Sequence, residues 1–174
     1  MLPSTPADPR RGKPAIQLRP VVPSDLPELF ELQCDPAANK LAGTKPRTRD
    51  GFFAAWARSL ADTRVNARII ELQRPAAWTI VGSIACFQVE EHGTSCDMLG
   101  YWIARPYWGM GIASLAASLF LAQEKRRPLL ATAATANTAS RKILERNGFR
   151  LIGIRMGEET DRYLASEIAE YTLD

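Results

Sequence analysis

The sequence predicts a single α/β (α+β) domain built on one mixed β-sheet that is flanked by helices. Three observations predict it. The 174 residues are 46% hydrophobic and 24% charged, which suits one domain with a sizeable core. The expected elements follow the order β-α-α-β-β-β-α-β-α-β-β, with no internal repeat. The central strand, helix and strand require a right-handed crossover between parallel neighbours, whereas the hairpins on either side are antiparallel, so the sheet is mixed.

Each element follows from periodicity and turn residues. The expected elements are a strand over 15–21, helices over 23–35 and 49–62, strands over 66–73, 78–90 and 95–104, a helix over 111–126, a strand over 128–135, a helix over 138–148, and strands over 149–156 and 162–174. Ser24 is the expected N-cap of the first helix, with Pro27 in its first turn, and Gly148 ends the last helix. The Gly, Pro and Thr content of 39–48 predicts a loop.

Composition excludes several classes of protein. The 22 basic and 19 acidic side chains give a net charge of +3, which is too even for a protein that wraps nucleic acid. Cys34, Cys86 and Cys96 are an odd count without framework spacing, as in a reduced, cytoplasmic protein. No metal site is expected, because these cysteines lack ligand spacing and His92 is the only histidine.

The first residues predict no structure of their own. Residues 1–14 contain four prolines, which predicts a flexible tail. One domain is expected to follow over residues 15–174. Their basic residues have no apolar core behind them, so no signal peptide is expected. No stretch of the sequence approaches the length of a membrane span, and no membrane partner is expected.

The stretch RPYWGMGIAS (105–114) holds two glycines, Gly109 and Gly111, between a strand and a helix. A helix N-terminus offers unpaired N–H groups and the positive end of a dipole, which attract an anion, and glycine lets a pyrophosphate approach the backbone. A plain strand-to-helix turn is the alternative. A dinucleotide fingerprint is excluded because the third glycine is missing, and a Walker loop because no Gly-Lys-Ser/Thr follows.

A second cluster begins where the strand over 128–135 ends. Asn137 is placed to cap the next helix through its side chain, and Ser140 lies in the first turn of that helix. Both residues stand beside the crevice where two parallel strands part, and such crevices bind ligands in open α/β sheets.

Together, GYWIARPYWGMGIASLAASLFL and NTASRKILERNGF resemble the GNAT superfamily of N-acetyltransferases over residues 16–174, closest to the ribosomal-protein N-acetyltransferase branch. The resemblance implies a sheet splayed between strands 4 and 5, with acetyl-CoA as co-substrate in the opening and no metal. Trp102 and Ile103 would pair with the pantetheine arm through their backbone, and Asn137 would touch it. The implied pyrophosphate loop consists of Trp108, Gly109, Met110, Gly111, Ile112, Ala113 and Ser114.

The sequence departs from the family pattern at this loop. Pro106 and Met110 stand where many members carry polar or basic residues, so binding is expected to be weaker rather than absent. Arg105 would restore some of the missing charge. Arg141, on the last helix, could meet the 3′-phosphate of CoA together with its basic neighbours, or belong to an ordinary solvated face.

The resemblance also implies catalytic roles. Many members carry a tyrosine acid where this chain has Leu144, whereas the closest branch uses the serine of NxxS, here Ser140, toward the leaving thiolate. The same branch places its base at Glu159, and another common base position is Met98. Ser140 bonding its own backbone, and Glu159 as a solvated turn carboxylate, are the alternatives. Direct transfer is favoured, with an oxyanion met by a backbone N–H near Ile103.

The sequence therefore predicts an N-acetyltransferase that moves an acetyl group from acetyl-CoA to a primary amine, on a peptide N-terminus or a small molecule, in a ternary complex. The alternative is a non-catalytic CoA-binding regulatory module with the same fold. The segment 39–53 and the hairpin around 157–163 would shape the acceptor pocket, but neither names the amine. The helix over 49–62 places Phe52 on the core or on an acceptor groove. A homodimer through the terminal strand is a further expectation.

Overall fold

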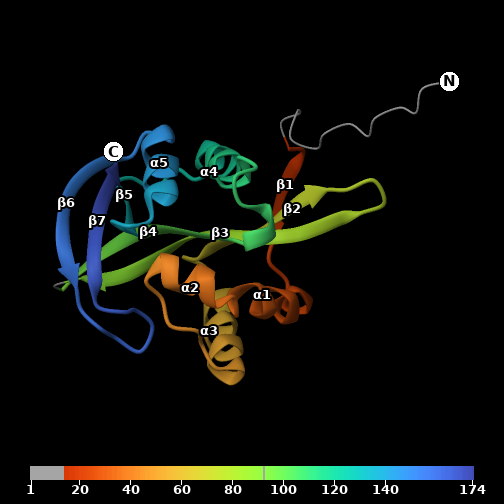
Figure 1. Ribbon diagram of the computed structural model, residues 1–174, viewed down its shortest axis with the longest axis horizontal. Helices are drawn as coiled ribbons and strands as arrows, with labels where there is room; N and C mark the ends of the chain where they lie inside the picture. Colours follow the sequence, from red (N-terminus) through yellow and green to blue (C-terminus); the bar gives the residue numbers. More distant parts are fainter. Residues whose placement is uncertain (1–13, 92) are drawn as a thin grey trace.

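The computed structural model describes residues 14–91 and 93–174 (Figure 1). The predicted tail, apart from Pro14, and His92 lie outside the described residues. None of the described helices is long and apolar enough to cross a membrane.

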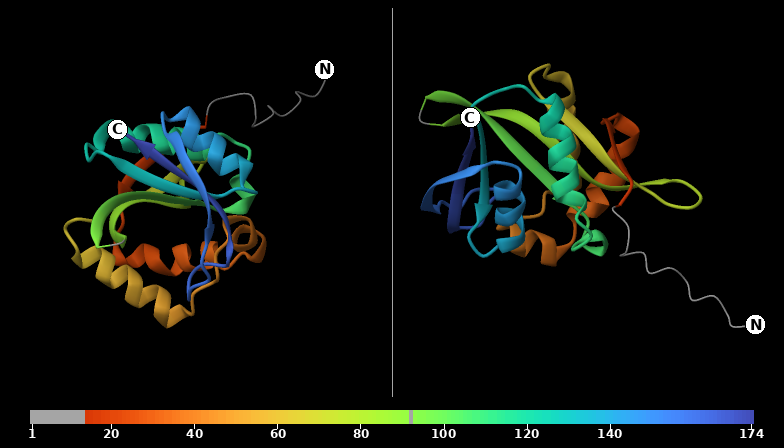
Figure 2. Two further views of the ribbon diagram at one scale, coloured as in Figure 1. Left: turned by 90° about the vertical axis from the view of Figure 1, so that its left-hand side faces the viewer. Right: turned by 90° about the horizontal axis from the view of Figure 1, so that it is seen from above.

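One seven-stranded sheet organises the chain, with the strand order β1-β2-β3-β4-β5-β7-β6. In chain order the elements are β1 (Ile16–Pro20), the 3-10 turn η1 (Pro23–Asp25), α1 (Leu26–Gln33), α2 (Pro36–Ala42), α3 (Arg49–Ala61), β2 (Asn66–Gln73), β3 (Trp78–Glu91), β4 (Thr94–Ile103), the 3-10 turn η2 (Arg105–Tyr107), α4 (Ile112–Gln123), β5 (Leu129–Ala134), α5 (Thr138–Arg146), β6 (Arg150–Gly157) and β7 (Ser166–Leu173). Figures 1 and 2 show α4 and α5 on one face of the sheet and α1 to α3 on the other. The predicted mixed, single-domain architecture is confirmed.

The sheet opens between β4 and β5. These two strands run parallel, yet only Met98 and Leu130 are in register, whereas β3 and β4 pair along their whole length. Both strands point their carboxyl ends the same way, so beyond Met98 they diverge and leave an opening at those ends. The predicted splay between the fourth and fifth strands is confirmed.

Two apolar clusters hold the helices to the sheet. On one face, Ile112 and Phe120 of α4 and Leu144 of α5 are at most 2% exposed and pack on the central strands. On the other, Phe52 of α3 is fully buried with Leu29 of α1. Phe52 therefore belongs to the core rather than to an acceptor groove. Helix α4 is fixed against the sheet, and its N-terminus is held beside the opening.

The predicted helix over 23–35 is wrong in its boundaries. Ser24 lies inside η1, and Asp25 rather than Ser24 precedes α1. The chain is extended at Asp35, whose carboxylate accepts the N–H groups of Ala37 and Ala38, so a new helix starts at Pro36. The predicted loop over 39–48 is consequently helical up to residue 42. The pair Asp35-Pro36, an N-cap followed by proline, was the sequence signal for the start of α2.

The C-terminal segment also differs from the prediction. The last strand begins at Ser166 rather than at residue 162, because Tyr163 forms a bridge with Thr44 instead. Strand β7 lies between β5 and β6, so both of its edges are paired within the chain. The terminal strand was expected to pair with a second copy of the chain, and this is not possible because neither of its edges is free. Helix α4 ends at Gln123, three residues before the predicted end.

Candidate active site

The backbone of Ile103 faces the opening between β4 and β5. The N–H of Ala104 donates to the Val81 carbonyl at 2.9 Å. Because alternate residues of an antiparallel strand turn their backbone groups to the same side, Trp102 also faces β3, whereas Ile103 faces away from it. The Ile103 carbonyl accepts the Trp108 indole N–H at 2.8 Å. Of the two predicted residues, Ile103 is thus the one whose backbone lies at the opening.

The side chain of Trp102 has a structural contact. Its indole Nε1 donates to the Leu32 carbonyl at 3.0 Å, which ties β4 to the end of α1. Gly82 lies on the neighbouring strand β3, and a Cβ at this position would clash with the Trp102 carbonyl oxygen. The glycine therefore allows β3 to lie close to the end of β4, and this packing fixes one wall of the opening.

The loop after β4 presents a run of unpaired amides. Gly109 and Gly111 have φ values of 75° and 77°, a region that favours glycine, and a Cβ at either position would project into open space. Gly111 is the N-cap of α4, and the Leu115 N–H donates to its carbonyl at 3.1 Å. Within the described ranges, no backbone N–H of residues 109–114 donates to another backbone group. These amides stand at the positive end of a 12-residue helix, an arrangement that binds anions.

Arg105 does not contribute a free positive charge to this loop. Its Nε lies 2.6 Å from Oδ2 of Asp35, the N-cap of α2. This hydrogen bond is the main reason why the pKa of Asp35 lies below its ordinary value. The expectation that Arg105 replaces the missing charge is therefore not supported, and the backbone amides remain the main anion-binding groups of the loop.

The N-terminus of α5 brings Asn137, Ser140 and Tyr101 together. The Asn137 side-chain oxygen accepts the Ser140 N–H at 3.0 Å, so the predicted cap is present. Ser140 Oγ lies 2.8 Å from the Tyr101 hydroxyl, which also lies 3.2 Å from the Ser140 carbonyl oxygen. Burial raises the pKa of Tyr101 to about 12, although its bond with Ser140 acts in the opposite direction. The phenol is therefore neutral over the physiological pH range.

Tyr101 was not among the site residues predicted from the sequence. Two residues apart on β4, Tyr101 and Ile103 have their side chains on the same face of the sheet, the face that α5 covers. The alternation of side chains along β4 was the sequence signal that could have identified Tyr101. The two positions where the family resemblance led us to look for acid or base residues hold apolar side chains. Leu144 is 1% exposed in the core, and Met98 lies where β4 and β5 part.

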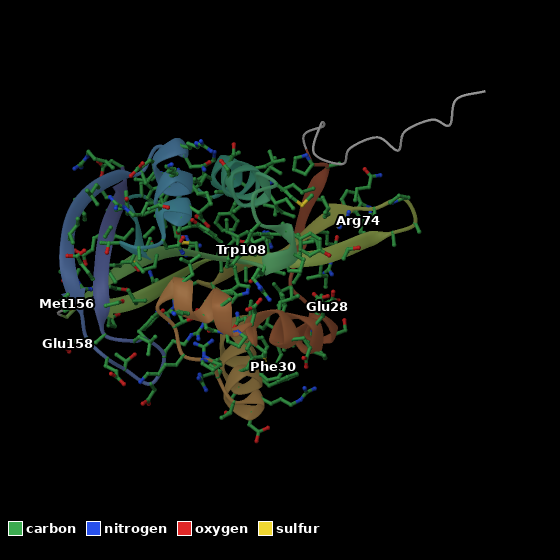
Figure 3. The ribbon with its side chains drawn as sticks, in the orientation of Figure 1. Glu28, Phe30, Arg74, Trp108, Met156 and Glu158 are labelled. Atoms are coloured by element: carbon green, nitrogen blue, oxygen red, sulfur yellow. The ribbon has the colours of Figure 1, made fainter. Side chains whose placement is uncertain are left out.

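A cavity of about 570 Å³ lies beside the end of β5. It extends from Trp108, at the start of the amide loop, to α2 and to the segment that precedes β7. Trp108 is labelled near the centre of the molecule in Figure 3. The walls are mostly apolar, with Lys40 and Glu167 as the charged residues. The lining consists of Ala37, Lys40, Leu41, Gly43, Trp108, Ala134, Thr135, Ala136, Leu164, Ala165, Ser166 and Glu167.

Two loops that are far apart in the sequence close one side of this cavity. The Lys45 N–H donates to the Arg162 carbonyl at 2.8 Å, and the Leu164 N–H donates to the Gly43 carbonyl at 2.9 Å. The Arg162 side chain also donates to the Lys45 carbonyl. Because Gly43 and Leu164 both line the cavity, the two segments that were expected to shape the acceptor pocket lie side by side at its wall.

Glu159 lies on the second of these loops. Its Oε1 is 2.6 Å from Lys45 Nζ, and its side chain is 62% exposed. The lysine holds the pKa of this carboxyl below its ordinary value. Glu159 is not among the residues that line the cavity, whereas Glu167 is. The Glu167 carbonyl accepts the Thr135 N–H at 2.9 Å, just past the end of β5.

Other charged groups have structural partners. Arg141, considered for a phosphate contact, donates from Nε to the hydroxyl of the fully buried Tyr171 at 3.0 Å. No group of three or more His, Cys, Asp or Glu side chains with metal-binding geometry occurs among residues 14–91 and 93–174.

Comparison with known proteins agrees with this geometry. The sequence model of the acetyltransferase (GNAT) domain matches residues 16–150. No curated protein has a significant sequence match to the chain. Spermidine N-acetyltransferase from Vibrio cholerae, in complex with CoA and spermine, has a TM-score of 0.74 at 14% identity over 91% of this chain and 94% of that chain.

Two further solved structures have similar scores. RimL, a ribosomal L7/L12 α-N-protein acetyltransferase in complex with coenzyme A, has a TM-score of 0.69 at 19% identity, over 91% of this chain and 93% of that chain. The microcin C7 self-immunity acetyltransferase MccE, in complex with acetyl-CoA and AMP, has a TM-score of 0.70 at 17% identity, over 91% of each chain. At these identities the likeness shows the fold. The ribosomal-protein enzyme is one neighbour among several.

Proposed function

Because the chain belongs to the acetyltransferase (GNAT) family, we propose that it transfers an acetyl group from acetyl-CoA to a primary amine, by direct attack in a ternary complex. The observation that carries this proposal is the run of unpaired amides over residues 109–114, which begins beside the opening between β4 and β5. Acetyl-CoA supplies the activated acyl group as a thioester. When both reactants are held in one opening, the reaction between them is faster because their relative orientation is fixed.

The residues at the opening suit acetyl-CoA. The amides of residues 109–114 would hold the pyrophosphate, since Gly109 and Gly111 leave open space where a side chain would otherwise project. The backbone N–H of Ile103 faces the opening and would meet the pantetheine arm or a developing oxyanion. Asn137 would stand on the opposite side of the opening, at the end of β5.

Ser140 is the proposed proton donor to the leaving sulfur, and Tyr101 supports it. The single Tyr101 proton can point to the Ser140 carbonyl, in which case the Ser140 hydroxyl donates to Tyr101. When the Ser140 proton turns toward the leaving sulfur, the Tyr101 proton can turn to Ser140 Oγ. The Ser140 oxygen then keeps a hydrogen-bond donor while it gives up its own proton.

Glu159 remains the proposed base toward the amine, and Glu167 is the alternative that the cavity favours. The Lys45 ion pair keeps Glu159 ionised, but its exposed position would require the amine proton to pass through water. Glu167 lines the cavity itself. The substitutions Glu159→Gln and Glu167→Gln show which of the two carboxylates acts as the base.

The acceptor is proposed to be a primary amine on a peptide N-terminus or a small molecule. The cavity supports an amine carried on a partly apolar group, since most of its lining is apolar. We also propose that the protein acts in the cytoplasm. This is supported by the fact that Cys34, Cys86 and Cys96 are all free thiols.

A non-catalytic CoA-binding module is the second candidate. The specific observation in its favour is that Leu144 and Met98, at two positions where the resemblance led us to expect acid or base groups, are apolar. Both candidates bind acetyl-CoA, so CoA release in the presence of an amine distinguishes them.

Calorimetric titration with acetyl-CoA tests the proposal first. We expect micromolar binding that Gly111→Val weakens by at least about tenfold, because the new side chain enters the anion site and the amides lose their geometry. Gly93→Val is the matched control. Gly93 has the same φ of 77° and equally open surroundings, but it lies in the β3–β4 turn, so its replacement carries the same backbone strain without the binding defect. An equal loss in both variants, or no binding by the unaltered chain, contradicts the proposal.

A further inference from the structure

A half-buried arginine beside the cavity has no acidic partner. The Arg162 side chain donates to the Lys45 carbonyl, and no carboxylate of the described residues pairs with it. Glu159, on the same loop, is paired with Lys45 instead. Burial, and then the positive charge of Arg47, hold the pKa of Arg162 below its ordinary value. A guanidinium has several N–H donors, so this partly desolvated cation can bind an anion in addition to the carbonyl.

The backbone turns Arg162 toward the cavity. On either side of Tyr163, the Arg162 carbonyl and the Leu164 N–H both bond to the segment that follows α2 (Figure 1). In such an antiparallel pair, successive side chains point to opposite faces, so Arg162 and Leu164 share one face and Tyr163 takes the other. Leu164 lines the cavity, and Arg162 therefore stands at the same wall.

The wall between Arg162 and Glu167 has charges of opposite sign at its two ends. Glu167 lines the cavity beside the end of β5, close to the opening where the thioester would lie. Leu164 and Ala165 supply an apolar surface between the two charges. Lys40, in the last turn of α2, is a further cation of the lining. A ligand that fits this wall has a cation at one end, an anion at the other and an apolar part between them.

We propose that the acceptor is a small amine that also carries an acidic group, separated from the amine by an apolar spacer. The proposal rests on the proposed acetyl transfer and names its substrate class. The amine lies toward Glu167, and the acidic group binds Arg162 and Lys40. A carboxylate and a phosphorus acid share this chemistry, because the planar guanidinium donates parallel hydrogen bonds to either. A diamine is disfavoured, since its second ammonium group would lie next to these cations.

Calorimetric titration of the protein saturated with CoA tests the substrate class without turnover. The probes are β-alanine, γ-aminobutyrate and ε-aminocaproate, each compared with the n-alkylamine and the α,ω-diamine of the same carbon number. Aminopropylphosphonate, compared with γ-aminobutyrate, distinguishes a phosphorus acid from a carboxylate. We expect at least one acid-bearing amine to bind about tenfold or more tightly than its alkylamine, and the diamines to bind most weakly. If no acid-bearing amine binds more tightly than its alkylamine, the proposal is wrong.

Two variants test the residues that bind the acidic group. Arg162→Met should raise the Kd of the acid-bearing amine about tenfold and change that of the alkylamine less than about twofold. Lys40→Met should reduce the same preference about threefold, and among the described residues its side chain has no partner whose loss would disturb the fold. Arg58→Met, at an exposed position of α3, is the matched control and should change neither Kd. Circular dichroism checks that each variant is folded. A preference that survives both Arg162→Met and Lys40→Met overturns the proposal.

Glu167→Gln tests the orientation of the ligand. It should weaken the acid-bearing amine and its alkylamine by the same factor, since the two share the amine. A loss confined to the acid-bearing amine would overturn the orientation.

Release of CoA from acetyl-CoA with the same amines keeps this inference apart from the proposed function. A binding preference without CoA release contradicts the acetyl transfer and leaves the acid-binding site in place. Release at the same kcat/KM with the acid-bearing amine and with its alkylamine contradicts the substrate class alone.

Discussion

The hydroxyl of Tyr101 on β4 lies 2.8 Å from Ser140 Oγ at the start of α5. This contact bridges the opening in the sheet, because β4 and α5 stand on its two sides. It joins a half-buried phenol with a raised pKa to a serine in the first turn of a capped helix. A serine in such a pair can release a proton and keep a donor, which is what a leaving sulfur requires.

Ser140→Ala should lower kcat about 100-fold, because the leaving sulfur loses its proton donor. Affinity for acetyl-CoA should change less than about twofold, since the amides of the loop are untouched. Steady-state kinetics and calorimetry check the two parts. Ser118→Ala, at an exposed position of α4, should leave both unchanged. An unchanged kcat in Ser140→Ala would show that the Ser140 hydroxyl is not the proton donor and that its contact with Tyr101 is only structural.

Tyr101→Phe should lower kcat about tenfold and leave the KM for acetyl-CoA nearly unchanged. The substitution keeps the packing of the ring but removes the donor to Ser140. Because Ser140 remains, the loss should be smaller than in Ser140→Ala. A double variant no slower than Ser140→Ala alone would place the two hydroxyls in one relay, and strictly additive losses would argue against it.

Glu159→Gln and Glu167→Gln separate the two proposed bases. If Glu159 takes the amine proton, its amide variant should lose at least about tenfold in kcat at neutral pH, and Glu167→Gln should lose little. The reverse result would identify Glu167, which lines the cavity, as the base. Lys45→Met is a useful control, since it removes the ion pair while both carboxylates remain. Equal, small effects of both amide variants would favour a water relay.

Alkaline stability should report the burial of Tyr101. Its pKa is about 12 in the folded chain and near 10 when unfolded, so the neutral phenol favours the folded state. The associated stability is fully present below pH 10 and is lost as pH rises toward 12, by about 2 kcal/mol. Denaturant titrations at pH 9 and 11 should show about half of this loss, roughly 1 kcal/mol, and Tyr101→Phe should reduce it. An equal loss in the variant would assign it to other groups.

Acid stability should depend on Glu124. Hydrogen bonds from Arg126, and then from Asn66, lower the pKa of this carboxyl to about 2. Because the folded pKa is depressed, the stability is present above pH 4.5 and is lost as pH falls toward 2, by about 1–3 kcal/mol. Glu124→Gln should be less stable at neutral pH and should show a shallower decline in denaturant titrations between pH 5 and 3. A decline as steep as that of the unaltered chain would refute this.

The sequence by itself determined the local features of the site. Gly109 and Gly111 adopt the left-handed backbone that only glycine tolerates well, and Asn137 caps α5 as its side-chain chemistry predicts. The order of the strands also followed from periodicity. These features depend on residues within a few positions of one another, so short-range propensity is enough to specify them. The opening between β4 and β5, by contrast, was implied by the family resemblance, and helix α2 was not predicted.

The tertiary structure alone decided which distant residues meet. Tyr101 reaches Ser140 across 39 positions, and Arg105 is held by Asp35 across 70. The loops that carry Lys45 and Glu159 close one side of the cavity across 114 positions. It also placed β7 inside the sheet and left β6 as the open edge. Contacts at such separations arise from the packing of helices and strands around one core, and no pattern within a short window of sequence encodes them.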